Sequence, residues 1–244
     1  MVTPKIPAYR VVAVAPAYNE AGKIGSVVRR CLPYVDEMVV ADDGSTDATA
    51  DEARKAGATV ITFENNRGVG AAIRAGIDHA LKTNADILII MGGDDQDSVE
   101  DIPMYLAAHA SGHAFVQGSR YMPGGRTINM PLTRSITTRM FTWFINRATG
   151  AGLTDASNGF RGINLHALRQ LMQAGKINLH QAWLDKYELE IYLLYKLLTT
   201  KIRLCELPVT KTFHRSKGFT KMRMFRDWWQ LIKPILLLKL GIRN

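Results

Sequence analysis

Short apolar runs alternate with helical stretches over the first half of the chain. The apolar runs are rich in Val and Ile and have the length of buried strands: Val11–Ala15, Met38–Ala41, Val60–Phe63, Ile87–Met91 and Phe115–Gln117. The stretches between them have helical spacing: Gly25–Cys31, Asp47–Ala56, Val69–Leu81 and Val99–Ala110. Strands that alternate with helices are typical of βαβ units. The pattern therefore predicts an α/β fold, with a mainly parallel sheet and helices on both of its faces.

The pattern changes after Tyr121, where Pro123-Gly124-Gly125 is typical of a turn. The elements predicted beyond it are the helices Leu132–Thr149 and Asp185–Leu198 and the strands Ile202–Leu204 and Val209–Phe213, which flank Pro208. A last, amphipathic helix is predicted from about Lys221. We therefore expect one α/β domain over residues 1–220 and a C-terminal helix over residues 221–244.

Each of the five strands in the first half is followed by a short polar cluster. In chain order, the clusters are Pro16–Glu20, Asp42–Asp47, Asn65–Gly68, Gly92–Asp97 and Gly118–Arg120. Ligands of open α/β sheets bind beyond the carboxyl ends of the strands, so we expect the clusters to converge on one site. That site is rich in Asp and Glu, and crowded carboxylates repel one another unless a cation joins them. The arrangement favours a divalent metal that carries a phosphorylated ligand.

The Gly92–Asp97 cluster is the candidate metal site. Asp94 and Gln96 lie two residues apart on this loop, so their oxygens can face the same way, and Mg²⁺ or Mn²⁺ prefers oxygen ligands. The alternative is an acidic N-terminus for the helix predicted over Val99–Ala110. That alternative accounts for Asp97 but not for two aspartates that directly follow a wholly apolar strand.

Two other kinds of site are disfavoured by the positions of their residues. The Gly-x-Gly of Gly68–Gly70 follows the third strand and lacks a third glycine, and Pro16–Glu20 has no glycine fingerprint, which argues against a nicotinamide or flavin enzyme. His109 and His113 are four residues apart, but they lack the cysteine or glutamate partners of common zinc sites. We expect both histidines to be solvated on the surface.

The positive charge of the chain is concentrated at its C-terminal end. The chain holds 31 Lys and Arg and 22 Asp and Glu, and residues 201–244 hold 11 and 2 of these, which leaves 20 of each sign before them. The net charge of +9 therefore belongs to the last segment, whose partner should be anionic: a phosphorylated substrate, a membrane surface or nucleic acid. Met1–Arg10 lacks an apolar run, so no signal peptide is visible, and Cys31 and Cys205 are expected to be reduced thiols of a cytoplasmic protein.

Together, the clusters resemble the GT-A glycosyltransferases of family 2, and most closely the branch that contains dolichyl-phosphate mannose synthases. The resemblance covers about Val11 to Lys221. The matching motifs are Pro16-x-Tyr18-Asn19-Glu20, Asp42-Asp43-Gly44-Ser45-x-Asp47, Asn66-x-Gly68 through Gly76, Gly118-Ser119-Arg120-Tyr121, Pro131-Leu132-x-Arg134, Asp155-x-Ser157-Asn158-Gly159-Phe160-Arg161, Tyr187-x-x-Glu190 and Arg215-x-x-Gly218-x-Thr220-Lys221. One departure is that the family's Asp-x-Asp reads Gly92-Gly93-Asp94 here. The first carboxylate is missing, and Asp95 and Asp97 are the candidates to replace it.

The resemblance implies an inverting transfer of a hexosyl group from a GDP- or UDP-linked sugar to a polyprenyl phosphate. The donor-binding residues that it implies are Pro16, Tyr18, Glu20, Asp42, Asp43, Arg215 and Lys221. The residues implied at the acceptor phosphate are Arg120, Arg134 and Thr138, and Asp94 and Gln96 are implied as ligands of Mg²⁺ or Mn²⁺. The catalytic set that it implies is Asp94, Arg120, Arg134, Arg215 and Lys221, which bind or neutralise the charged phosphates. No strong base is needed, because a phosphate monoester with a second pKa near ~6 is largely dianionic at neutral pH.

Three rival functions stay open at this point. A family 2 transferase that acts on a glycan hydroxyl requires a general base, and Asp95 or Asp97 could serve. A sugar-nucleotide nucleotidyltransferase favours a glycine-rich first loop with Lys or Arg, which Pro16–Glu20 is not. A non-enzymatic binding module is suggested only by the glycine at position 92. A nucleic-acid-binding protein is not among the three, because it accounts for the basic tail but not for the acidic edge of the sheet.

The C-terminal segment predicts binding to a membrane surface without a membrane span. Its longest apolar stretch, Leu231–Ile242, is short of the ~20 residues that a span needs and is broken by Lys233, Pro234 and Lys239. An apolar stripe with basic neighbours is formed by Met222, Phe225, Trp228, Trp229 and Ile232 with Lys221, Arg223, Arg226 and Lys233. Such a helix suits the headgroup interface, so we expect a peripheral protein at the cytoplasmic face of a membrane. A second apolar run, Met140–Ile145, fits either a ledge for a lipid tail or ordinary core packing.

Overall fold

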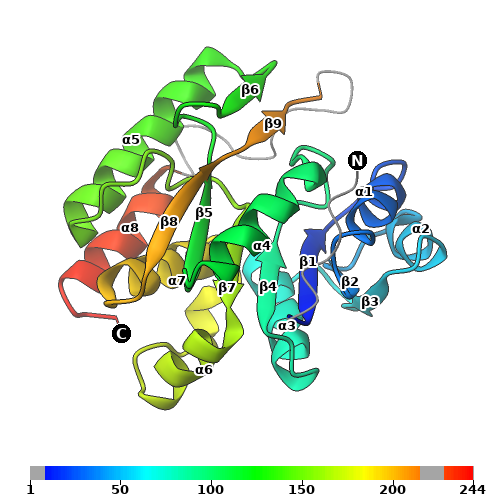
Figure 1. The fold of residues 1–244 in the computed structure, drawn as a ribbon, viewed down its shortest axis with the longest axis horizontal. Coiled ribbons are helices and arrows are strands. Elements are labelled where there is room, and N and C mark those ends of the chain that lie inside the picture. The colour runs from blue at the N-terminus through cyan, green and yellow to red at the C-terminus, as the bar shows by residue number, and fades with distance from the viewer. Residues whose placement is uncertain (1–8, 215–227, 244) are drawn as a thin grey trace.

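The computed structural model describes residues 9–214 and 228–243, which form one seven-stranded sheet with helices on both faces. The strand order is β3-β2-β1-β4-β7-β5-β8 (Figure 1). The strands are β1 Val11–Ala17, β2 Glu37–Asp42, β3 Thr59–Thr62, β4 Ile87–Ile90, β5 Phe115–Ser119, β7 Arg161–Asn164 and β8 Leu204–Pro208. The α/β fold expected from the alternating pattern is confirmed.

The sheet is parallel except at β7, which runs antiparallel to its neighbours β4 and β5. Ile89 of β4 and Val116 of β5 both pair with Gly162 of β7. Because β4 and β5 are both antiparallel to β7, they point the same way as each other, and β1 is parallel to β4. The carboxyl ends of β1 to β5 therefore lie at one edge of the sheet, which brings the five polar clusters to the same side.

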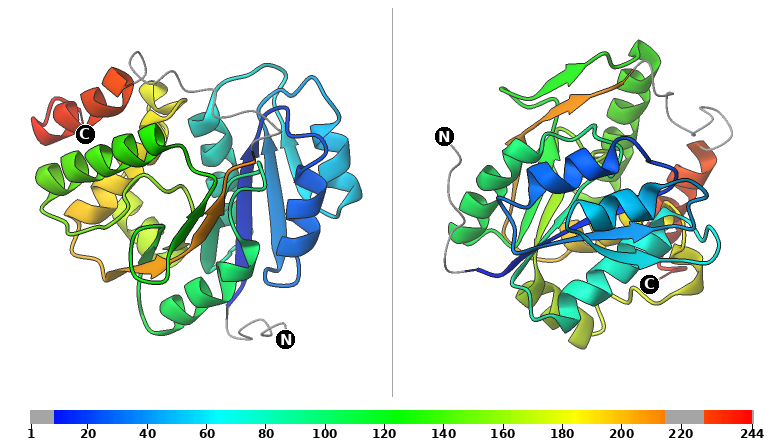
Figure 2. Two further views of the ribbon diagram at one scale, coloured as in Figure 1. Left: turned by 90° about the horizontal axis from the view of Figure 1, so that it is seen from above. Right: turned by 90° about the vertical axis from the view of Figure 1, so that its right-hand side faces the viewer.

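Two hydrophobic clusters cover the two faces of the sheet, as side chains alternate along each strand. In β1, Val12 and Val14 belong to one cluster, and Val11 and Ala13 belong to the other. The first face is covered by α3 Val69–Lys82, α5 Leu132–Thr149, α6 Leu165–Gln173, α7 Glu188–Thr199 and α8 Trp228–Lys239. The second face is covered by α1 Ile24–Cys31, α2 Thr49–Lys55 and α4 Ile102–Ala110, which continues the 3₁₀ turn η1 Val99–Asp101 (Figure 2).

Several elements were not predicted from the sequence. They are the strands β6 Arg126–Ile128 and β7, the helix α6 and the 3₁₀ turn η2 Ala182–Leu184. The prediction of strands on either side of Pro208 is wrong in its bounds, because β8 runs through Pro208 and the next strand, β9, is Thr210–Thr212. Pro208 ends an edge strand, where a missing N–H leaves no gap in the sheet. β9 pairs with β6 in a separate two-stranded sheet.

The C-terminal helix packs on the domain. Within the described residues, α8 begins at Trp228, whereas residues 215–227, which include the predicted start at Lys221, lie outside the description. Ile232, Ile235 and Leu238 are buried in the first hydrophobic cluster, between α5 and α7. No helix in the described parts of the chain has the length and hydropathy needed to cross a bilayer.

The histidine prediction is wrong for His109, which is buried on α4. Its Nδ1 donates to the carbonyl oxygen of His113, 2.8 Å away. Its Nε2 faces β7, where a Cβ at Gly162 would lie only 2.5 Å from it. Burial lowers the pKa of His109 from 6.5 to about 4, so the ring is neutral in the folded protein at pH 7.

Candidate active site

The first two polar loops at the sheet edge are bound to each other. The backbone N–H of Asn19 donates to Ser45 Oγ at 2.9 Å, and the N–H of Thr46 donates to Asn19 Oδ1 at 2.9 Å. Asn19 has φ = 55°, a conformation that asparagine tolerates better than most residues. The N–H of Glu20 donates to Thr49 Oγ1 at 2.8 Å, which ties the same loop to α2. Pro16 is the last residue but one of β1, and Tyr18 and Glu20 lie on the loop that follows the strand.

Buried aspartates organise the loops that follow β2 and β3. Asp42 accepts from the N–H of Ser45 at 3.1 Å. Asp43 accepts from the N–H groups of Arg67 and Gly68 at 2.7 and 2.9 Å, and so holds the start of α3. Both carboxylates are almost fully buried and are stabilised by backbone donors rather than by cations. The structure thus places the predicted donor residues of these loops side by side at the edge of the sheet.

In the fourth loop, two carboxylates converge on the space beside Gly92. A Cβ added at Gly92 would lie 2.7 Å from Asp94 Oδ1 and 3.3 Å from Asp97 Oδ2. Asp97 is buried; its Oδ2 accepts from the N–H of Gly92 at 2.9 Å, and its Oδ1 accepts from Lys211 Nζ at 2.8 Å. Lys211 lies on β9 and was not singled out from the sequence. The absence of a side chain at position 92 therefore lets Asp94 Oδ1 lie where a Cβ would clash with it.

Asp95 points away from this space. Its carboxylate pairs with Arg30 of α1 at 2.8 Å, and its carbonyl accepts from His214 Nε2 at 2.7 Å. Asp95 has φ = 62°, so the chain turns sharply between Asp94 and Gln96. The N–H of Gln96 donates to Asp94 Oδ1 at 3.3 Å, and the carbonyl of Gln96 accepts from the N–H of Thr212. β9 and α1 thereby fix the loop from two sides.

The donor set fits a metal that also takes oxygens from its ligand. No group of three or more His, Cys, Asp or Glu side chains in the described residues is arranged to hold a metal ion alone. Mg²⁺ commonly uses one or two protein carboxylates and completes its coordination with phosphates and water. Asp94, with Gln96 two residues on, supplies oxygens of the right type at the end of β4. These residues suit a metal–diphosphate complex.

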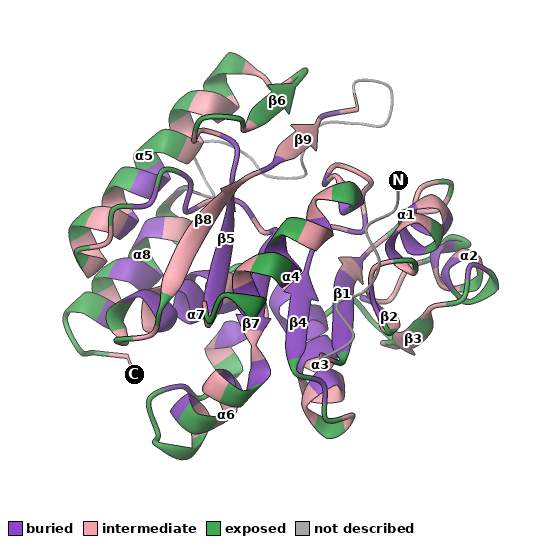
Figure 3. Ribbon diagram, in the orientation of Figure 1, coloured by how far each residue is buried: buried purple, intermediate pink, exposed green. Residues whose placement is uncertain are grey.

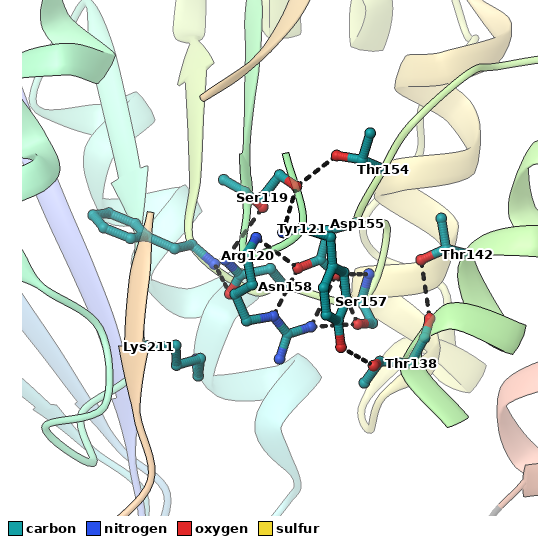
Figure 4. Close-up of polar contacts among 12 residues, drawn as sticks. Ser119, Arg120, Tyr121, Thr138, Thr142, Thr154, Asp155, Ser157, Asn158 and Lys211 are labelled. Carbon is teal, nitrogen blue, oxygen red and sulfur yellow. Dashed lines mark hydrogen bonds and ion pairs between the residues drawn. The ribbon is translucent and has the colours of Figure 1, made fainter. Parts of the chain in front are cut away.

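On the other side of the site, Arg120 is held by Asp155 (Figure 4). Arg120 Nε and Nη2 donate to the two carboxylate oxygens at 2.7 and 2.9 Å, and Nη2 also donates to Ser157 Oγ at 2.6 Å. Burial by itself lowers the pKa of Arg120, but the hydrogen bonds and charge of Asp155 outweigh it and leave the pKa raised. Within the described chain, Nη1 is the one guanidinium nitrogen of Arg120 without a protein partner.

The loop that supplies Asp155 is fixed to β5 by buried polar contacts. Gln117 Nε2 donates to the carbonyls of Asp155 and Asn158, and Arg161 Nε donates to Gln117 Oε1 at 3.0 Å. A Cβ at Gly118 would lie 3.0 Å from the carbonyl oxygen of Phe160 and 3.1 Å from Asn158 Nδ2, so glycine at this position allows the loop to approach closely. The sequence motif from Asp155 to Arg161 therefore builds the support of Arg120.

Arg134 differs from Arg120 because it has no carboxylate partner among the described residues. It lies near the start of α5, with its guanidinium 4.8 Å from the centre of the Phe213 ring. Burial lowers its pKa, and the charge of Arg120 lowers it further, while Asp94 acts in the opposite direction. Arg134 therefore lies within electrostatic reach of both the aspartate loop and Arg120. A half-buried cation without a carboxylate partner favours an anionic ligand.

Thr138 and Tyr121 extend this cationic site along α5. The two hydroxyls are 2.6 Å apart, and Thr138 Oγ1 also donates to the carbonyl of Arg134 (Figure 4). Arg139 lies 4.1 Å from the centre of the Tyr121 ring, and Arg120 lies 5.5 Å from it. Tyr121 ends the Gly118–Tyr121 motif noted in the sequence, whereas Arg139 was not among the predicted site residues. Arg215 and Lys221, the other predicted cations, lie outside the described residues.

The comparisons with known proteins agree with this arrangement. Residues 12–172 match the sequence model of glycosyl transferase family 2. The chain belongs to that family. It is 30% identical over 225 residues to the polyprenol monophosphomannose synthase of Mycolicibacterium smegmatis, which covers 88% of this chain and 82% of the relative. It is 28% identical to the undecaprenyl-phosphate mannosyltransferase of Micrococcus luteus, with 87% of each chain covered.

Solved structures show the same fold for this family 2 transferase. The glucosyl-3-phosphoglycerate synthase of Mycobacterium tuberculosis, in complex with Mn²⁺, UDP-glucose and phosphoglyceric acid, superposes with a TM-score of 0.66. The match covers 97% of this chain and 82% of that one, at 20% identity. The expected GT-A fold and glycosyltransferase activity are confirmed. The nucleotidyltransferase and the non-enzymatic binding module are thereby set aside.

Proposed function

We propose that this transferase moves a hexosyl group, with inversion, from a nucleoside diphosphate sugar to a polyprenyl phosphate. The observation that carries the proposal is Arg134, a half-buried cation near the start of α5 that has no carboxylate partner in the described chain and lies within electrostatic reach of Asp94 and Arg120. A phosphate bound between Arg134 and Arg120 is adjacent to the edge where the donor loops meet. The named relatives act on polyprenol and undecaprenyl phosphate acceptors, which agrees with such a site.

The donor is assigned to the loops after β1, β2 and β4. Pro16, Tyr18, Glu20, Asp42 and Asp43 form the nucleoside side, and Asp94 and Gln96 face the diphosphate. A bound Mg²⁺ or Mn²⁺ neutralises charge on the leaving nucleoside diphosphate. Arg215 and Lys221 are assigned to the same diphosphate from the sequence motif alone. Whether the base is guanine or uracil, and which hexose is carried, are the questions for the experiment below.

The acceptor phosphate is assigned to Arg134, Thr138 and the remaining nitrogen of Arg120. Asp155 holds the Arg120 guanidinium in one orientation. A phosphate that binds at Nη1 therefore need not order this side chain, which reduces the entropic cost of binding. Arginines bind phosphate through several fixed N–H groups. The phosphate monoester is largely dianionic at neutral pH, with a second pKa near ~6, so it attacks the anomeric carbon without a strong general base.

The state of the aspartates favours a phosphate acceptor over a glycan hydroxyl. A hydroxyl acceptor requires a carboxylate that is free to take its proton. Asp97 already accepts from Lys211 and from the N–H of Gly92, and Asp95 pairs with Arg30. Each of these two carboxylates is therefore already engaged by a cation of the protein. Transfer to a glycan hydroxyl is therefore the second candidate.

We also propose that residues 1–220 are the catalytic domain and residues 221–244 are a helix at the membrane interface. The protein would then be peripheral at the cytoplasmic face of a membrane. The support is the concentration of positive charge after residue 200 and the lipid acceptors named for the relatives. The packing of Ile232 and Ile235 on the domain indicates that this helix would stay attached to the catalytic domain as it binds.

The decisive test is a panel of nucleotide sugars. Purified protein is incubated with GDP- and UDP-linked hexoses, with and without a polyprenyl phosphate and Mn²⁺, and the products are identified by mass spectrometry. The expected product is a hexosyl-phosphoryl-polyprenol, formed only when both substrates are present. Transfer to an added glycan with none to the lipid phosphate would establish the second candidate instead.

A further inference from the structure

Helix α5 carries a stripe of exposed apolar side chains. Leu132, Ile136, Met140 and Trp143 are 75, 51, 44 and 60% exposed. Their spacing of four, four and three residues keeps them within an arc of about 80° on a helix that turns about 100° per residue. Phe141 and Ile145, on the opposite side, are buried against the core. The run Met140–Ile145, left open by the sequence, is thus divided between core and surface, as the bands along α5 in Figure 3 show.

The surroundings of the stripe are basic. Neither α5 nor α8 contains an Asp or Glu, while Arg139 and Arg147 are exposed on the same side of α5 as the stripe. α8 lies beside α5 in the views of Figures 1 and 2, and Lys239 Nζ donates to the carbonyl of Arg147 at 3.2 Å. The exposed apolar side chain Leu236 also lies on α8. Apolar residues among arginines and lysines without acidic neighbours fit an anionic lipid surface.

A second copy of the chain fits this face less well. Two stripes in contact would bring Arg139 and Arg147 of both copies together with no carboxylate from α5 or α8 to pair with them. Like charges that face each other across an interface oppose association. An anionic bilayer supplies phosphates for the arginines and an apolar boundary for Ile136 and Trp143.

The same helix carries the proposed acceptor site on its inward side. Arg134 and Thr138 alternate in sequence with Leu132, Ile136 and Met140. Their side chains lie on another side of the helix, where they contact Phe213 and Tyr121. A helix with its side chains is about 10 Å across. A phosphate held by Arg134 is therefore about one helix width from a surface on which Leu132 and Ile136 rest. A lipid phosphate in the headgroup layer would reach it without leaving the bilayer.

We propose that the α5 stripe is the surface that docks this enzyme on an anionic bilayer, with α5 parallel to the membrane plane. Its role in presenting the acceptor rests on the proposed function, whereas the docking itself does not. Leu132, Ile136, Met140 and Trp143 enter the headgroup boundary, and Arg139 and Arg147 contact lipid phosphates. The stripe adds a second contact to the one predicted for the basic C-terminal segment.

The test uses vesicles of phosphatidylcholine with an equal part of phosphatidylglycerol. The full-length protein should co-sediment with them at low salt, and the Ile136→Gln/Trp143→Gln variant should bind about tenfold less, because two large apolar side chains no longer enter the boundary. Met140→Gln should bind severalfold less, on the order of threefold. The matched control is Met104→Gln on α4, where Met104 is 37% exposed but outside the stripe, and it should bind as the wild type does.

Three parallel readouts separate the possible failures. Binding of GDP and UDP by calorimetry should be the same in wild type and stripe variants, which shows that the variants are folded. Equal vesicle binding by wild type and the double variant would overturn the docking proposal, and so would a wild-type dimer in light scattering that the variant converts to monomer. Sugar transfer to polyprenyl phosphate in detergent micelles tests the proposed function separately, since it needs no bilayer.

Discussion

The proposed donor and acceptor sides of the site hold their charged groups by different means. On the donor side, Asp42 and Asp43 accept from backbone N–H groups of nearby loops. On the acceptor side, Arg120 is paired with Asp155, 35 residues away, and both are buried. A carboxylate that accepts from amides keeps partners when its charge is removed, because a neutral amide oxygen still accepts. A buried arginine that loses its carboxylate is left with an unpaired charge. Replacement of a buried aspartate by a neutral residue should therefore lower the stability of the protein more on the acceptor side than on the donor side.

Asp155→Asn should give the largest effect. The substitution leaves Arg120 charged and buried without its anion, which typically costs about 3–5 kcal/mol of stability. Urea unfolding followed by circular dichroism measures the loss. The matched control is Asp43→Asn, a buried aspartate with backbone donors, for which about 1–2 kcal/mol is expected. Equal losses for the two variants would show that the two sides do not differ in this way.

Asp94→Asn should affect turnover rather than folding. Loss of one group that stabilises developing charge typically lowers kcat about 10²–10³-fold. Because Asp94 is only partly buried, the free energy of unfolding should change by less than about 0.5 kcal/mol. The control is Asp51→Asn, whose exposed side chain lies on α2. Activity near that of the wild type at saturating Mn²⁺ would remove Asp94 from the donor site.

His109, buried against β7, makes the stability of the fold sensitive to pH. Its folded pKa of about 4 lies below the ordinary 6.5, so between these values the unfolded chain takes up a proton that the folded protein excludes. Stability is therefore retained above pH 6.5 and falls as the pH drops toward 4, by about 2 kcal/mol between pH 7 and pH 5.

The measurement is the urea midpoint at the two pH values for the wild type and for His109→Gln. The variant should lose most of the difference, since glutamine does not titrate. His166→Gln, an exposed histidine on α6, should keep it. A pH dependence that persists unchanged in His109→Gln would assign it to other groups.

Arg134→Ala should have the smallest effect, and only on one substrate. Removal of a charge-assisted contact to phosphate should raise the KM for polyprenyl phosphate about tenfold, with the KM for the nucleotide sugar within about twofold. Steady-state kinetics with each substrate varied in turn gives both values. Arg147→Ala, on the exposed side of the same helix, should leave both unchanged in detergent. Weaker donor binding by Arg134→Ala in calorimetry would place Arg134 at the donor instead.

Local pattern was enough to predict the donor side. The apolar runs specify β1 to β5, and the polar residues that follow each run lie at the sheet edge because parallel strands share one direction. The loops of Asp42, Asp43 and Asp94 needed no knowledge of distant residues beyond that rule. Family motifs added the acceptor residues Arg120, Arg134 and Thr138, but they did not indicate that Arg120 is bound by Asp155.

The tertiary structure decided what depends on contacts between distant segments. β7 is four residues long, includes Arg161 and Gly162, and carries no strand signal of its own. It exists because β4 and β5 both pair with it. Lys211 reaches Asp97 across 114 residues, and His109 is buried because α4 packs on β7. Which side of α5 is exposed was likewise settled by its packing against α7 and α8. The helical repeat determines which residues of a sequence share a face of the helix, but only the neighbouring elements determine which of its faces is buried.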